Sequence, residues 1–139
     1  MLLTIDSSVI IAAIREQEPR HREAVQLLQK IVNADHVAIM PYTVLTEIVS
    51  AIRRRTGSKE LATRIENDLE SITTIYFLEI VKSRIKEANK IAIEHGLRGM
   101  DAIVVQSAKE NNSSLVTLDN QMAKMASKSV KVISIEKLL

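Results

Sequence analysis

The chain opens with the stretch Leu2-Leu3-Thr4-Ile5-Asp6, in which a short, largely apolar run is followed at once by an acid. The stretch Leu115-Val116-Thr117-Leu118-Asp119 repeats this pattern near the other end of the chain. Apolar runs of this length without strict alternation are typical of strands buried on both faces, as in parallel sheets. We therefore predict that both runs are parallel strands and that Asp6 and Asp119 close their carboxyl ends.

Strand-like and helical patterns alternate along the rest of the chain. The predicted strands lie near residues 2–5, 36–40, 76–80, 114–118 and 131–135. Apolar residues at helical spacing predict helices between them, including a helical hairpin near 43–55 and 58–72. This alternation is typical of βαβ units. The sequence thus predicts an α/β fold in which a central parallel sheet of about five strands is flanked by helices.

The composition is that of an ordinary globular protein. With 139 residues, 46% hydrophobic and 26% charged, the chain suits one domain over residues 1–139. The absence of cysteine excludes thiolate sites and disulfides and fits a reducing cytoplasm. The longest apolar stretches, such as residues 9–14, are far shorter than the roughly 20 residues of a membrane span. We expect a cytoplasmic protein that does not act in a membrane.

Two further acids stand near the predicted starts of helices. Asp101 directly precedes the apolar run 102–105, and Glu47 lies in the first turns of the helix predicted over 43–55. In open α/β folds, strand carboxyl ends and the following helix N-termini share one edge of the sheet, where ligands bind. We therefore expect Asp6, Glu47, Asp101 and Asp119 to meet there. Such oxygen-only ligands suit Mg²⁺ or Mn²⁺ better than zinc.

Each of these acids also has a purely structural interpretation. Aspartate is a preferred N-cap, and Asp6, Asp101 and Asp119 all precede possible helices. Glu47 would then be a solvated residue that gains a little from the helix dipole. Independent caps need not converge in space, whereas the ligands of one ion must. The two interpretations therefore differ in the geometry that they predict.

Four segments of the chain together resemble the PIN domain family, of the kind found in VapC-like toxin ribonucleases. No single motif is specific, but their order, the spacing between Asp101 and Asp119 and the chain length are similar to that family. The resemblance covers essentially the whole chain and implies a three-layer PIN-like fold. It also implies an Mg²⁺- or Mn²⁺-dependent endoribonuclease. The segments are Leu3–Ile10, Val44–Ala51, Met100–Val104 and Leu115–Asp119.

The resemblance assigns roles to individual residues. The catalytic and metal-binding quartet would be Asp6, Glu47, Asp101 and Asp119, and Ser8 and Thr117 match positions that help to shape the site. Some relatives carry a further acid just after the fourth, where this chain has Asn120, Gln121 and Met122. Whether one or two metal ions bind is therefore left open.

The resemblance also implies partners. These are an RNA substrate, a small VapB-like antitoxin that covers the active groove, and a second copy of the chain in a homodimer. The helical hairpin near residues 43–72 is the surface that we expect to contact protein partners, because it carries more Leu, Ile and Val than one sheet face requires.

Other chemistries remain as alternatives. A metal-free ribonuclease would need its own acid and base, usually His, and His21, His36 and His95 form no recognisable pair or ligand motif. Aspartyl-phosphate chemistry, as in receiver domains or haloacid-dehalogenase-like phosphatases, also places an Asp at a strand end. Such phosphatases would have a second carboxylate where this chain has Ser8. A non-catalytic PIN-like module for RNA binding or assembly would be expected to have a degraded quartet.

Basic residues offer two possible contacts to nucleic acid. Arg53, Arg54 and Arg55 end the helix of Glu47, where they suit either the helix dipole or phosphate groups. Lys124, Lys128 and Lys131 follow Asp119, near the expected active edge, and suit either a solvated face or a phosphate backbone. The chain has a net charge of +2 and only 2% aromatic residues, so base stacking can contribute little to nucleic-acid binding. Any contact to RNA would run mainly through phosphate.

Overall fold

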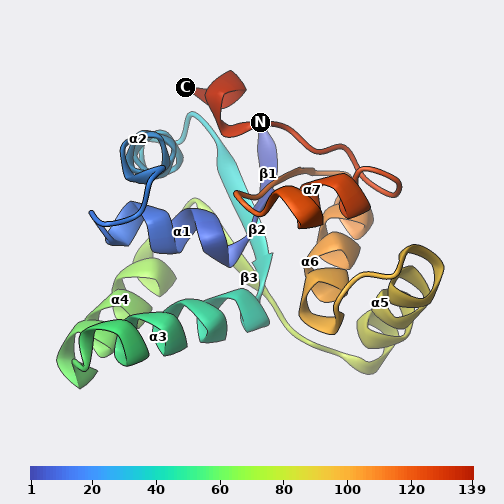
Figure 1. Cartoon of the computed structure of the whole chain (residues 1–139), viewed down its shortest axis with the longest axis horizontal. Coiled ribbons are helices and arrows are strands. Elements are labelled where there is room, and N and C mark those ends of the chain that lie inside the picture. Colours follow the sequence, from blue (N-terminus) through green and yellow to red (C-terminus); the bar gives the residue numbers. More distant parts are fainter.

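The structure is a computed structural model that describes residues 1–139, and it contains a parallel sheet between layers of helices (Figure 1). The sheet has four strands in the order β3-β2-β1-β4, and every pairing between neighbours is parallel. The prediction of an α/β fold around a parallel sheet is confirmed. The strands are β1 (Leu2–Ile5), β2 (Val37–Pro41), β3 (Ile75–Leu78) and β4 (Ser114–Val116).

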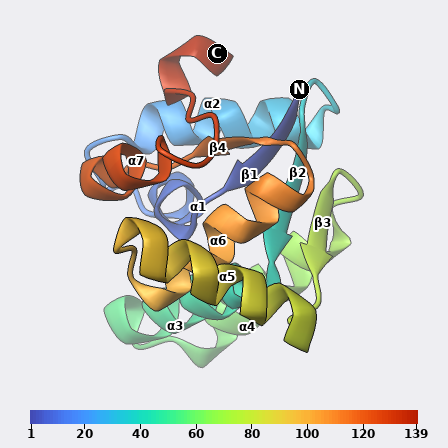
Figure 2. The same ribbon diagram turned by 90° about the vertical axis from the view of Figure 1, so that its right-hand side faces the viewer.

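Helices cover both faces of this sheet. Figures 1 and 2 show α1 and α2 on one side of it and α6, with α5 outside it, on the other. The helical hairpin of α3 and α4 packs beside α1, β2 and β3. The helices are α1 (Ser7–Ile14), α2 (His21–Val32), α3 (Tyr42–Thr56), α4 (Lys59–Ser71), α5 (Lys82–His95), α6 (Gly99–Glu110) and α7 (Asn120–Ala126). None of them is both long and apolar enough to cross a bilayer.

The strand predicted at 131–135 is reduced to a single bridge. Leu115 pairs in parallel with Val132, and Ile135 already begins the 3₁₀ helix η1 (Ile135–Leu138). The reason lies in β4, which ends at Val116 instead of residue 118. The backbone amides of Leu118 and Asp119 donate to the side-chain hydroxyls of Ser8 and Thr117, so the chain leaves the ladder there. Only a short edge remains for a fifth strand.

The core runs through the sheet and both helix layers. Leu3, Ile5 and Leu115 are fully buried, as expected for central strands of a parallel sheet. On one side, α6 buries the small and branched residues Ala102, Val104, Val105 and Ala108. This packing fixes the carboxyl end of β1 and the first turn of α6 relative to each other, which places Asp6 and Asp101 at one edge.

The hairpin of α3 and α4 has the predicted form but not the predicted apolar surface. Gly57 ends α3 in the left-handed conformation at φ +71°, and Ser58 caps α4 by accepting a hydrogen bond from Leu61 N. No large apolar side chain of residues 43–72 is exposed, because α3 turns its apolar face into the core. Four of the exposed large apolar residues, Tyr42, Tyr76, Ile80 and Val81, lie instead around the start of α3 and the end of β3, and the others are spread over the chain.

Candidate metal and catalytic site

A cleft of about 870 Å³ opens at the carboxyl ends of β1 and β4. All four acids singled out from the sequence line it, and they come from four different elements. One follows β1, one lies in α3, one lies in the first turn of α6 and one precedes α7: Asp6, Glu47, Asp101 and Asp119. The fold therefore brings the quartet together, as expected, and its role in metal binding stays a prediction.

Helix capping accounts for only one of the three aspartates. Asp119 is the N-cap of α7, and its Oδ1 accepts from Met122 N at 3.0 Å. Asp6 precedes α1, but its side chain makes no capping hydrogen bond. Asp101 is not a cap at all, because α6 begins two residues earlier and Arg98 is its N-cap. Capping leaves Asp6 and Asp101 unexplained at the edge of the sheet.

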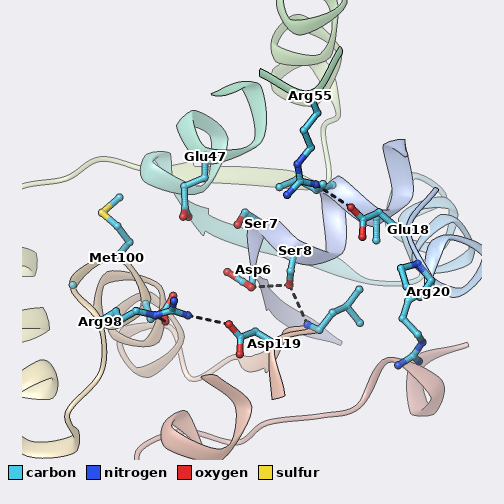
Figure 3. Close-up of a pocket in the computed structure, with 16 residues that line it drawn as sticks. Asp6, Ser7, Ser8, Glu18, Arg20, Glu47, Arg55, Arg98, Met100 and Asp119 are labelled. Carbon is cyan, nitrogen blue, oxygen red and sulfur yellow. Dashed lines mark hydrogen bonds and ion pairs between the residues drawn. The ribbon is translucent and has the colours of Figure 1, made fainter. Parts of the chain in front are cut away.

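Two hydroxyl groups hold Asp6 in place (Figure 3). Ser8 Oγ donates to Asp6 Oδ2 at 2.7 Å, and Thr117 Oγ1 donates to the same oxygen at 2.8 Å. Each hydroxyl also accepts from a backbone amide, Leu118 N on Ser8 and Asp119 N on Thr117. A hydroxyl has one proton, so these contacts fix both donors toward Asp6. Asp6 as a whole is only 6% exposed, and its Oδ1 receives no hydrogen bond from the protein.

Ser8 and Thr117 both contact Asp6, and their role in shaping an active site stays a prediction. Together they join the end of β1 to the segment between β4 and α7, across an interval of more than a hundred residues. The same contacts set the backbone of Asp119. The relative position of two members of the quartet therefore depends on two small hydroxyl side chains.

The carboxylates lie in a shared negative field. Burial raises the pKa of the half-buried Glu47, and the charges of Asp6 and Asp101 raise it further. The pKa of Asp101 is also raised, first by burial and then by Asp6 and Asp119, although Arg98 opposes the shift. Like charges that disfavour each other's ionised forms at one site are what a bound cation would relieve.

Arg98 is the one cation paired with the quartet. Its Nε lies 3.2 Å from Asp101 Oδ2, and its Nη2 lies 3.0 Å from Asp119 Oδ2. These two carboxylates raise the pKa of Arg98, with Asp101 making the largest contribution. The sequence analysis missed this residue. The available signal was an arginine three residues before Asp101 at a predicted helix start, a spacing at which side chains on a helix meet.

The far end of the cleft is lined by arginines. Figure 3 shows Arg55 and Arg20 on the side away from Arg98. Arg55 Nη1 pairs with Glu18 Oε1 at 2.9 Å, while Arg20 pairs with Glu23 and Glu136. Of the three arginines that end α3, only Arg55 lines the cleft. The lysines at 124, 128 and 131 do not line it, and their contact with a phosphate backbone stays a prediction.

The donor set suits a hard divalent cation, although the ligands are not gathered around a single point. No three acidic or histidine side chains are grouped as ligands, and Arg98 lies between two of the acids. The cleft contains no histidine, and His21 Nδ1 lies 2.7 Å from the carbonyl of Ala12 instead. Carboxylate oxygens alone, with Asp6 Oδ1 free of protein donors, fit Mg²⁺ or Mn²⁺.

Comparisons with known proteins place the chain in a family. The profile of the PIN domain matches residues 3–128. No curated protein matches the sequence. Among solved structures, VapC20 of Mycobacterium tuberculosis, described as a toxin that cleaves the sarcin-ricin loop, has a TM-score of 0.75 at 16% identity, covering 94% of this chain and 98% of that chain.

Two VapBC structures have the same fold. VapBC2 from Rickettsia felis, bound to a DNA fragment from its promoter, gives a TM-score of 0.70 at 13% identity, covering 96% of this chain and 98% of that chain. VapBC-1 from nontypeable Haemophilus influenzae gives 0.65 at 14% identity, covering 98% and 99%. Identities this low establish a shared fold alone. Because the family profile spans most of the chain, the protein belongs to the PIN domain family.

Proposed function

We propose that this protein is an Mg²⁺- or Mn²⁺-dependent endoribonuclease that hydrolyses RNA phosphodiester bonds, and that it is the toxin of a VapBC-type toxin-antitoxin pair. The observation that carries the proposal is the convergence of four carboxylates, from four elements, on one cleft. Membership of the PIN domain family, whose members are generally nucleases, supports it. VapC20, which has this fold, is described as a toxin that cleaves the sarcin-ricin loop.

The side chains that line the cleft would have different roles in catalysis. Asp6 and Asp101 would hold the ion, with Asp119 and Glu47 completing its shell or orienting water. When bound, such an ion supplies a water of lowered pKa and offsets charge on the phosphate and leaving oxygens. Ser8 and Thr117 keep Asp6 Oδ1 available by occupying Oδ2. Glu47, with its raised pKa, accepts a proton more readily than an ordinary carboxylate.

The rest of the cleft suits a phosphate backbone. Arg55 and Arg20 are partly exposed at the end away from Arg98, where they can contact phosphates that flank the scissile bond. Aromatic groups contribute little, because Tyr42 and Phe77 stack on each other at 5.4 Å and neither lines the cleft. The proposed substrate is therefore a single-stranded or looped RNA that is held through its backbone.

Partners and location belong to the same proposal. A small VapB-like antitoxin is supported by the VapBC complexes that have this fold. A homodimer and a cytoplasmic location are proposed on the family resemblance. Copurification from the native host, followed by mass spectrometry and size-exclusion chromatography, tests all three. Recovery of a monomer without a small partner contradicts the toxin assignment. The nuclease assignment does not depend on this result and is tested by the cleavage assay.

The cleavage assay compares the wild-type protein with Asp6→Asn on mixed RNA in Mg²⁺, Mn²⁺ or EDTA. We expect cleavage that requires a divalent ion and falls at least about a hundredfold in Asp6→Asn, since even outer partners of metal ligands typically cost 10- to 100-fold. Asp68→Asn, on the exposed surface of α4, is the matched control and should cleave normally. An Asp6→Asn protein that cleaves like wild type contradicts the assignment, and no cleavage by any form favours a non-catalytic module.

A further inference from the structure

Arg98 lies across the mouth of the acidic end of the cleft. It bridges Asp101 and Asp119 through two different nitrogen atoms, at 3.2 and 3.0 Å, yet its side chain remains 72% exposed. Exposed ion pairs contribute little to stability, because solvent screens them and a long side chain loses rotamer freedom. The bridge is therefore weak enough to exchange for another partner.

Arg98 occupies a place where the four carboxylates need a positive charge. No other cation is paired with any of the four acids. One delocalised positive charge therefore offsets the quartet only in part. A divalent ion carries twice that charge on a smaller radius, so it would compete well for the same oxygens.

We propose that Arg98 fills the place between Asp101 and Asp119 in the ion-free protein, that a divalent cation displaces it, and that the freed guanidinium then binds a phosphate of the strand in the cleft. This inference rests on the proposed function for the class of substrate. Arg98 is thus a positioning residue whose partner changes from carboxylate to phosphate.

The surroundings allow this exchange. A guanidinium presents a planar fork that matches carboxylate and phosphate oxygens equally well. The next residue is Gly99, and a Cβ atom built there would meet nothing within 4 Å apart from its own helix and chain neighbours, so open space lies beside it. Arg98, Gly99 and Met100 all line the cleft. A displaced guanidinium therefore stays at the mouth of the cleft, beside the path of a bound strand.

One consequence is a coupling between the two ligands. A cation that releases Arg98 makes one more phosphate contact available, so cation binding strengthens nucleic-acid binding, and by linkage the reverse also holds. Without the cation, Arg98 stays engaged with its carboxylates and contributes no phosphate contact. The coupling should vanish when Arg98 is removed.

The first arm of the test uses Mn²⁺ alone. Isothermal titration compares wild type, Arg98→Ala, Arg98→Lys and the control Arg64→Ala, an exposed arginine on α4 without an ion pair. We expect Arg98→Ala to bind Mn²⁺ about two- to tenfold more tightly than wild type, since two exposed ion pairs no longer compete. Arg98→Lys should fall between them, and Arg64→Ala should match wild type. Circular dichroism checks that each variant is folded.

The second arm measures the affinity of a short fluorescein-labelled DNA single strand, which has the phosphate backbone without the 2′-hydroxyl. The slope of log affinity against log salt reports the number of phosphate contacts, with about 0.7 per contact on a single strand. In Mn²⁺, Arg98→Ala should lower the slope by about 0.7 relative to wild type. In EDTA, the two slopes should agree.

The outcomes separate this inference from the proposed function. Equal Mn²⁺ affinities in wild type and Arg98→Ala would overturn the displacement, even if RNA is cleaved. Tighter Mn²⁺ binding with an unchanged salt slope would overturn the phosphate contact. An absence of Mn²⁺ binding in both proteins would overturn the inference together with the metal site. Neither arm requires cleavage, so failure of the nuclease assay leaves both readouts intact.

Discussion

At the level of single residues, the orientation of Asp6 is decided by neighbours that carry no charge. The hydroxyl groups of Ser8 and Thr117 each donate their one proton to Asp6 Oδ2. Each also accepts a hydrogen bond from a backbone amide in the segment that leads to α7. The carboxylate thus presents one oxygen to the cleft and keeps the other within the protein. An acid at a strand end becomes a directed ligand through these two contacts.

Removing one of these hydroxyls should affect both stability and the site. Thr117→Val keeps the shape of the side chain but deletes a donor to buried Asp6 and the acceptor of Asp119 N. We expect a loss of about 1–3 kcal/mol in the free energy of unfolding, measured by urea denaturation, and weaker Mn²⁺ binding. Thr117→Ser retains the hydroxyl and should restore most of both. If valine and serine behave alike, the hydroxyl does not hold Asp6.

The raised pKa of Glu47 predicts how stability depends on pH. Burial, Asp6 and Asp101 raise this pKa above its value in the unfolded chain. Between the unfolded and folded pKa values the folded protein binds more protons, so its stability falls as pH rises through that window. Glu47→Gln should therefore be more stable than wild type at neutral pH in EDTA, with a difference that shrinks in acid.

Urea denaturation across a pH series measures this difference. Glu70→Gln, an exposed position on α4, is the matched control and should follow the wild-type curve. A Glu47→Gln protein that is less stable than wild type at neutral pH would show that the ionised carboxylate is stabilised in the fold, contrary to the shift described above.

At the level of elements, α3 connects the two ends of the cleft. Glu47 and Arg55 are separated by about two turns of this helix, or about 12 Å along its axis. The buried Ala51 lies midway between them, which keeps the same side of the helix against the body of the protein. A rigid helix thus sets the spacing between the acidic quartet and an arginine available for phosphate.

Arg55→Ala should therefore weaken nucleic-acid binding. The substitution removes a cation that lines the cleft, and we expect the salt slope for a single strand to fall by about 0.7. Arg54→Ala, on the neighbouring position outside the cleft, removes the same charge and should leave the slope unchanged. Fluorescence anisotropy with a labelled oligonucleotide over a salt series gives both slopes. Equal effects of the two substitutions would reduce Arg55 to general surface charge.

The strands also show which features of the fold could be predicted from the sequence and which could not. The runs 2–5 and 114–118 were identified as strands because their apolar residues suit a buried parallel sheet, and both are strands, the second ending at Val116. The end of β4 depends on hydroxyl contacts from Ser8, more than a hundred residues away, which no local pattern contains. For the same reason, the strand predicted at 131–135 is reduced to the bridge between Leu115 and Val132. Of the two partners of Arg98, only Asp101 is near it in the sequence, whereas Asp119 is 21 residues away, so no local pattern indicates the bridge.

At the scale of the whole molecule, the strand order explains why distant acids meet. β1 lies between β2 and β4, and Ile5 is in register with Val116, so the chain segments that carry Asp6 and Asp119 leave adjacent strands at the same edge. The general rule for ligand sites in α/β folds was sufficient to predict this convergence. The remaining question is whether the four carboxylates act as one cation site.

Thermal unfolding of wild type and Asp101→Asn, each in EDTA and in Mn²⁺, answers this question without any substrate. Because burial and neighbouring acids raise the pKa of Asp101, the apo form of Asp101→Asn should be at least as stable as wild type at neutral pH. Saturating Mn²⁺ should stabilise wild type by about 2.7 kcal/mol at about 100 times the dissociation constant, and stabilise Asp101→Asn much less. Equal responses of the two proteins to Mn²⁺, or no response in wild type, would contradict a shared cation site.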